Sequence, residues 1–176
     1  MAATLTTLLK NIKVNLNDGT NYAACAAAIG KAEISPVFFL AGRASPVAYI
    51  VPGAGRTTHS GLATHTVRKV TIYVVTRRGI TPTMTTALVG ESSIEGIADV
   101  TEKVKQALDR PYPYATGRGL PSGASYTAQN SVAAVMFEGE GEPFLEEDYG
   151  YSREEGTMAL VVPLEFEYAY IETRSA

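Results

Sequence analysis

The segment from Thr157 to Ile171 most constrains what this chain can fold into. Apolar or aromatic side chains occupy every second position: Met158, Leu160, Val162, Leu164, Phe166, Tyr168 and Tyr170. Because successive side chains of a β-strand point to opposite faces of a sheet, this period predicts one long strand with one apolar face. At about 3.3 Å per residue the strand reaches roughly 50 Å. A small domain covers only part of that length, so we expect part of the strand to meet another chain.

Pro163 interrupts this pattern near its centre. A proline has no backbone N–H and therefore leaves one ladder hydrogen bond unmade, which marks a bulge, a bend or an edge position. We predict that the strand has two halves with different partners.

Apolar spacings of three and four predict helices elsewhere in the chain, and alternating or continuous apolar runs predict further strands. The helices are expected over Leu5–Leu16, Tyr22–Gly30 and Ser93–Asp109, and the strands over Pro36–Leu40, Val47–Val51, Thr66–Thr76 and Ser131–Phe137. These elements predict a single α+β domain over residues 1–176. It has an antiparallel or mixed sheet with helices packed on one face, long loops and an extended C-terminal strand.

The predicted helix at Ser93–Asp109 carries its own start and stop signals. Ser92 is placed to cap the first N–H groups while Glu95 reaches back, as in a capping box, and Pro111 forbids continuation. Gly96 falls inside this helix, where glycine costs about 1 kcal/mol relative to alanine. Close packing against a sheet is the expected reason for it.

Glycine-rich and polar stretches predict irregular structure over Gly53–His65, Arg110–Asn130 and Glu138–Gly156. Loops of this length are uncommon in compact domains unless they are functional or disordered. The second and third stretches contain tyrosines, which give a large contact area at low entropic cost. We therefore expect these two loops to become ordered on a partner.

The net charge of −3 conceals an asymmetry along the chain. Residues 1–137 contain 13 Lys and Arg against 7 Asp and Glu, whereas residues 138–176 contain 2 against 11. If the two parts occupy separate surfaces, the basic surface of one copy can meet the acidic surface of the next, which is head-to-tail association. Alternatively, the two parts pair within one copy or stay solvated.

The 176 residues contain no clear catalytic, nucleotide-binding or metal-binding motif. The run Gly53–Thr58 lacks the residues of a Rossmann or P-loop motif, and His59 and His65 have no evident orienting acid. Cys25 is expected to be a small buried residue. We predict no enzyme activity, no cofactor, no metal, no membrane segment and no specific nucleic-acid binding.

The segments Thr66–Thr76, Ser93–Leu108 and Met158–Tyr168 together resemble the tail terminator, or tail completion, proteins of long-tailed bacteriophages. The resemblance covers roughly residues 67–171 and is carried by the order of strand, helix and closing strand. It implies an α+β subunit of a hexameric ring that caps the growing tail tube and gives the neck a docking surface. It also implies a structural virion protein that is assembled in the host cytoplasm.

Such a ring is held together by interfaces, and basic, acidic and tyrosine side chains are the expected contacts. They are Arg56, Arg77, Arg78, Tyr112, Tyr114, Arg118, Tyr126, Glu138, Glu140, Glu146, Glu147, Tyr149, Tyr168 and Tyr170. Arg77 and Arg78 are expected in a turn that meets the neighbouring subunit. The expected partners are further copies, the tail tube protein and head-connector or neck proteins, with DNA passing through the ring.

Two other functions are compatible with the sequence. A tail tube or head-completion protein of the same assembly would share these features but would stack into repeated rings or bind the portal side. A small-ligand-binding enzyme domain would instead use residues 53–61 as its binding loop.

Overall fold

The structure is a computed structural model that describes residues 5–17, 19, 23–36, 46–60, 63–78, 88–91, 94–108, 132–147 and 158–173. Three long antiparallel strands form its centre. They are β2 (Val47–Ser60), β3 (Ala63–Arg78) and β8 (Met158–Thr173). Within the described residues the sheet order is β1-β2-β3-β8-β6, with β7 also paired to β8. The outer strands are β1 (Lys31–Ile34), β6 (Val132–Glu140) and β7 (Phe144–Glu147). Because β1 runs parallel to β2 and all other pairs are antiparallel, the sheet is mixed.

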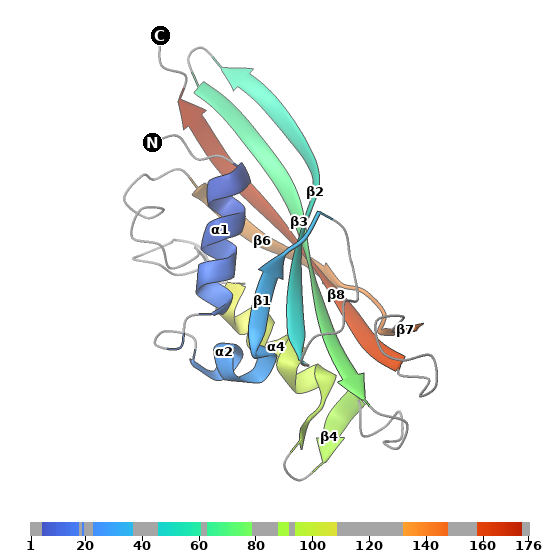
Figure 1. Ribbon diagram of the computed structural model, residues 1–176. Coiled ribbons are helices and arrows are strands. Elements are labelled where there is room, and N and C mark those ends of the chain that lie inside the picture. The colour runs from blue at the N-terminus through green and yellow to red at the C-terminus, as the bar shows by residue number, and fades with distance from the viewer. Residues whose placement is uncertain are drawn as a thin grey trace.

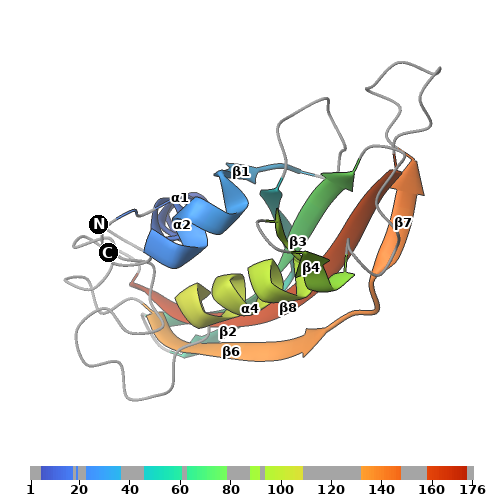
Figure 2. The same cartoon turned by 90° about the horizontal axis from the view of Figure 1, so that it is seen from below.

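The described helices α1 (Leu5–Leu16), α2 (Ala23–Ile29) and α4 (Ile97–Leu108) lie on one face of this sheet (Figures 1 and 2). The α+β class with helices on one face is therefore confirmed. Apolar side chains of both layers are buried together in the main core. They include Leu8, Ile12 and Leu16 of α1, Val100 and Val104 of α4, and Ile72, Leu164 and Phe166 of the sheet.

The helices α1 and α2 match their sequence predictions closely because their apolar spacing is regular. Asn15 is a polar exception on the buried side of α1. Its Nδ2 donates to the carbonyl oxygen of Ala107 at 2.7 Å, which satisfies one of the last carbonyl groups of α4. This hydrogen bond ties α1 to the C-terminal end of α4.

The long C-terminal strand is present as β8, and its two faces differ as predicted. Leu160, Val162, Leu164, Phe166 and Tyr168 are buried under the helices. The opposite face carries Glu165, which is exposed, and Glu167, which is half-buried. The two-halves prediction is also confirmed: β7 pairs with residues 158–161, and β6 pairs with residues 164–170.

Pro163 lies at the gap between these two partners. Its carbonyl oxygen accepts a hydrogen bond of 2.9 Å from the N–H of Gly141, in the connection from β6 to β7. Proline has no backbone N–H to donate to a neighbouring strand, and at Pro163 neither β6 nor β7 pairs with β8. The missing donor therefore costs no hydrogen bond of the ladder. Along its other edge β8 pairs with β3 from Met158 to Thr173.

The prediction of irregular structure over Gly53–His65 is wrong. These residues complete β2 and begin β3, which are joined as a hairpin with Ser60 opposite Ala63. Polar side chains here form hydrogen bonds across the two strands, since the hydroxyl groups of Thr57 and Thr66 lie 3.4 Å apart. The acidic stretch is also partly regular, because residues 138–140 end β6 and residues 144–147 form β7.

The start of the third predicted helix was placed four residues too early, as α4 begins at Ile97. Residues 94 and 95 form β5 (Ile94–Glu95), which pairs with β4 (Gly90–Glu91). Gly96 precedes the helix, and its carbonyl oxygen accepts the hydrogen bond from Val100 N–H. A Cβ at Gly96 would lie under 3.0 Å from backbone atoms of Leu88, Val89 and Gly90, so this close approach requires glycine.

The predicted strand Pro36–Leu40 falls almost entirely outside the described residues. The short strand β1 was missed, because its alternation of polar and apolar residues spans only four positions.

Candidate functional site

None of the described helices covers the second face of the sheet, and this face is the candidate interaction surface. Its rows follow from the strand register. One row joins Tyr49, Tyr73 and Pro163, the next joins Val51, Thr71 and Glu165, and Lys69 lies opposite Glu167. The two ends of the face therefore differ in chemistry.

One end of this helix-free face is apolar. Val47, Tyr49, Val75, Ala159 and Val161 form a second buried cluster, separate from the main core, with Val51 and Tyr73 packed against it. Phe144 of β7 lies opposite Val161 and is partly exposed. The other end of the face is polar, with Arg56, Lys69 and Glu165 exposed.

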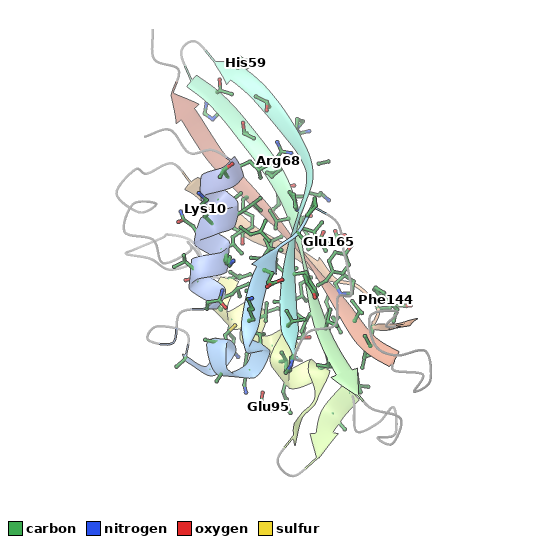
Figure 3. The ribbon with its side chains drawn as sticks, in the orientation of Figure 1. Lys10, His59, Arg68, Glu95, Phe144 and Glu165 are labelled. Atoms are coloured by element: carbon green, nitrogen blue, oxygen red, sulfur yellow. The ribbon has the colours of Figure 1, made fainter. Side chains whose placement is uncertain are left out.

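The β2–β3 hairpin carries a polar stripe on its other side (Figure 3). His59 lies toward the free end of the hairpin, and its Nδ1 is 3.2 Å from the hydroxyl of Thr64. Arg68 donates from Nη1 to the carbonyl oxygen of Gly53 at 3.1 Å. Its guanidinium occupies the space where a Cβ of Gly55 would stand. The glycines thus allow the arginine to cross a β-bulge between Pro52 and Gly55.

This geometry removes the basis of the ligand-loop alternative. Residues 53–60 continue a strand, so they do not form a phosphate-binding loop. Among the residues that the structure describes, no group of His, Cys, Asp and Glu is arranged to hold a metal ion. Burial raises the pKa of the Cys25 thiol to about 12, against a weaker opposing influence of Lys103, so the expectation of a buried cysteine is confirmed.

Two strands leave one backbone edge open in the described part of the sheet. On β2, residues 47–50 pair with β1, but residues 51–60 have a partner only on the β3 side. On β6, the partner is β8, with nothing described on the other side. By contrast, β8 is paired with β3 along the whole of one edge, and with β7 or β6 over residues 158–161 and 164–170 of the other.

Some of the predicted charge complementarity is satisfied inside one copy. Lys105 of α4 lies 3.0 Å from the Oε2 of Glu140 in β6, and it also pairs with Glu102. Burial lowers the pKa of Lys105, but its hydrogen bonds to Glu102 and Glu140 outweigh this and raise it above 10.5. Glu138 and Glu142, on either side of Glu140, are exposed.

The structure places the expected interface residues in different ways. Arg56 is exposed on the polar end of the helix-free face, near one open edge. Arg77 and Arg78 were expected in a turn, but they end β3 opposite Ala159 and Met158, because this strand extends to match the whole length of β8. Glu146 and Glu147 lie in β7, opposite Ala159 and Met158 on the other edge of β8.

Tyr168 is a correction to the expected interface. Its side chain is fully buried in the main core, with its ring 6.4 Å from that of Phe166, because its face of β8 is covered by helices. Tyr170 lies in β8 opposite Thr66 and Val132. Tyr112, Tyr114, Arg118, Tyr126 and Tyr149 fall outside the described residues.

Comparisons with known proteins give little further identification. No protein-family model matches the chain, and no curated protein matches it. Among solved structures it is similar to a chain of the "Virion of native gene transfer agent (GTA) particle", with 15% sequence identity, 94% of each chain covered and a TM-score of 0.45. No described helix has the length and hydropathy of a membrane span.

Proposed function

We propose that this chain is a structural virion protein that forms a ring at the neck end of a phage tail. In this role it terminates growth of the tail tube and provides the docking surface for the head connector. The single observation that carries the proposal is the one-sided sheet. Among the described residues, helices cover one face, while the polar end of the other face and two strand edges are left for contacts.

The lengths of the strands support an assembly role. β3 and β8 each have 16 residues, about three times the usual strand length. The polar hairpin of β2 and β3 continues the sheet for several residues past the apolar rows. A sheet of this kind gives a subunit a long contact line for its neighbours.

The order of elements supports a terminator in particular. The strand, helix and closing strand that carry the resemblance to tail terminator proteins correspond to β3, α4 and β8. These elements are in contact in the structure, and α4 packs against both strands. The assembly interfaces, together with the tube and connector surfaces, are then the activity of the protein.

Native mass spectrometry of the purified chain tests the ring. We expect one closed oligomer, with six copies as the count that the resemblance implies. A chain that stays monomeric from low to high concentration and in the presence of tail tubes would overturn the proposal.

Electron microscopy separates the terminator from its alternative, a tail tube or head-completion protein. A terminator forms single rings, and its addition to polymerising tube protein stops elongation at one end. Stacking of this chain alone into tubes would instead identify it as a tube protein.

A further inference from the structure

The outer side of α1 is basic and carries an exposed apolar side chain. Lys10 is exposed, Lys13 is half-buried and Val14 is 52% exposed, while the helix contains no acidic residue. Neither lysine forms an ion pair within the described residues. The next helix, α2, contains no charged residue, and the side chains that it exposes are alanines. A solvated helix normally carries polar side chains on its outer face, so this surface has the character of a contact.

On the other side of the sheet, β8 directs two acidic side chains away from the helices. Glu165 is exposed and Glu167 is half-buried, and no described residue forms an ion pair with either of them. Across the strands, Glu165 lies between Thr71 of β3 and Gly139 of β6, so no basic side chain stands directly opposite it. These two acids are therefore available to a basic partner.

We infer that α1 of one copy packs against the β8 side of the helix-free face of the next copy, with its two lysines facing the two acids. The inference rests on the proposed ring and names the contact that closes it, so the occupant of this face is a second copy of the chain. Figure 2 shows α1 on one side of the sheet, whereas Glu165 and Glu167 belong to the other side. The two surfaces therefore cannot meet within one copy, and a contact between unlike surfaces is head to tail, as rings require.

Charge directs α1 to one part of the helix-free face. Two α1 surfaces would bring lysines together, and like charges across an interface are unfavourable. On the helix-free face, Arg56 and Lys69 lie on β2 and β3. The exposed Glu138 and Glu142 belong to β6, which is the neighbour of β8, and to its continuation. The lysines of α1 are therefore attracted to the β8 side and repelled from the β2 side.

The spacing of the charges fits an α1 helix that lies along β8. Lys10 and Lys13 are one helical turn apart, which separates their Cβ atoms by about 5–6 Å. Glu165 and Glu167 project from the same face of a strand, about 7 Å apart. The flexible lysine side chains cover the small difference, so each ammonium group can reach one carboxylate.

Val14 gives this contact an apolar centre. It follows Lys13 on the outer side of α1. Beyond Glu167, the next row of the helix-free face joins Val67 and Ala169, and both side chains are half-buried. Val14 of one copy packs on this row of the next, which removes apolar surface from water beside the ion pairs.

The levels of the two surfaces along the subunit also agree. In Figure 1, α2 with its exposed alanines lies below the middle of α1, where Figure 3 labels Lys10. Phe144 is 36% exposed and lies opposite Val161, four residues before Glu165, and Figure 3 shows it below Glu165. A rotation about an axis near the vertical of these views keeps each level. The lysines then meet the acids, and the alanines of α2 meet Phe144.

Reversal of charge on each surface tests the contact in the full chain. The helix variant carries Lys10→Glu and Lys13→Glu, and the strand variant carries Glu165→Lys and Glu167→Lys. Each variant places like charges at every interface, so we expect the protein concentration at half assembly to rise roughly tenfold or more at low salt. The chain with all four changes has opposite charges again, so its rings should return.

Mixing the two variants gives a sharper readout. In a head-to-tail ring, the acidic α1 of the helix variant meets the basic β8 of the strand variant, and the two unchanged surfaces meet likewise. We expect rings in which the two variants alternate, which native mass spectrometry detects as a one-to-one composition. The matched control carries Lys10→Arg and Lys13→Arg, which keep both charges, and it should assemble like the wild-type chain.

Disulfide mapping measures the contact with all four charges in place, so it decides the question even where a reversal variant does not fold. In a Cys25→Ala background, Val14→Cys is combined with Ala169→Cys, and mild oxidation should link neighbouring copies. The control combines Val14→Cys with Thr58→Cys. Because Thr58 is exposed on β2, two strands away from β8, this pair should stay unlinked. Unfolding curves confirm that each variant is folded before it is scored.

The outcomes separate this inference from the proposed function. Rings that form normally in the helix variant, or wild-type-like rings without the Val14–Ala169 disulfide, would overturn the contact and leave the ring proposal standing. Loss of assembly in the strand variant alone would indicate a face-to-face contact of two sheets, with Lys69 against Glu167, and would also overturn it. A wild-type chain that forms no ring would overturn both.

Discussion

The two faces of the sheet are built from the same strands but obey different constraints. On β8, Phe166 is buried under the helices, whereas its neighbour Glu165 is exposed on the helix-free face. Alternation along a strand thus separates the residues that hold the fold from those available for contacts. Substitutions on the two faces should therefore have separable effects on stability and on assembly.

The helix-free face is itself divided. Its apolar end contains a second buried cluster around Tyr49 and Val161, while its polar end carries Arg56 and Lys69 in the open. The apolar end contributes to folding of the single copy, so it resembles the covered face in its energetics. The polar end and the two open edges are left as the contact surface.

The largest expected effect comes from Phe166→Ala. This change removes a fully buried ring from the main core, and we expect it to lower the free energy of unfolding by about 3–5 kcal/mol. Glu165→Ala, one residue away on the other face, should change it by less than about 0.5 kcal/mol. Urea unfolding followed by circular dichroism measures both. Equal losses for the two variants would show that the faces are not distinct.

A second pair compares two glycines. Gly96→Ala places a Cβ against the backbone of residues 88–90, so we expect a loss of about 1–3 kcal/mol from the forced backbone shift. Gly139 lies opposite Glu165, and a Cβ built there meets nothing within 4 Å. Gly139→Ala should therefore be close to neutral in the same unfolding assay. A neutral Gly96→Ala would mean that the approach of residues 88–90 to α4 is dispensable.

Regular apolar patterns allowed much of the covered layer to be predicted. The period of two in β8 and in Val70, Ile72 and Val74 of β3 is imposed by burial under helices, so it is visible in the sequence. The helix α1 is visible for the same reason. In the hairpin of β2 and β3, residues 54–59 are exposed and the buried positions carry Thr64 and Thr66, so no apolar pattern is present. This is why residues 53–65 were predicted to be irregular.

Tertiary contacts account for the remaining errors. The approach of Gly96 to residues 88–90 delays the start of α4, although the local sequence contains a capping box. The candidate contact edges depend on strand order, and no local sequence pattern predicts the order β1-β2-β3-β8-β6. Arg56 and Glu138 were predicted as contacts from their charge, but their places beside two different open edges emerge only from the fold.

The smallest expected effect concerns the tie between the helix layer and β6. Lys105 and Glu140 are both partly exposed, so Lys105→Gln should cost no more than about 1 kcal/mol. A double-mutant cycle with Glu140→Gln should give a coupling energy of about 0.2–1 kcal/mol. Lys105→Gln combined with Glu102→Gln is the control cycle, because that pair lies within α4 and does not reach the sheet.

The pH dependence of this coupling has a defined sign. The pKa of Lys105 is raised in the folded chain, so its contribution to stability is complete below the ordinary value of 10.5 and is lost as the pH rises through the folded value. Urea unfolding should therefore give the same coupling energy at pH 7 and pH 9 and a smaller one at strongly alkaline pH. A coupling energy of zero at neutral pH would show that the ion pair between Lys105 and Glu140 does not stabilise the contact between α4 and β6.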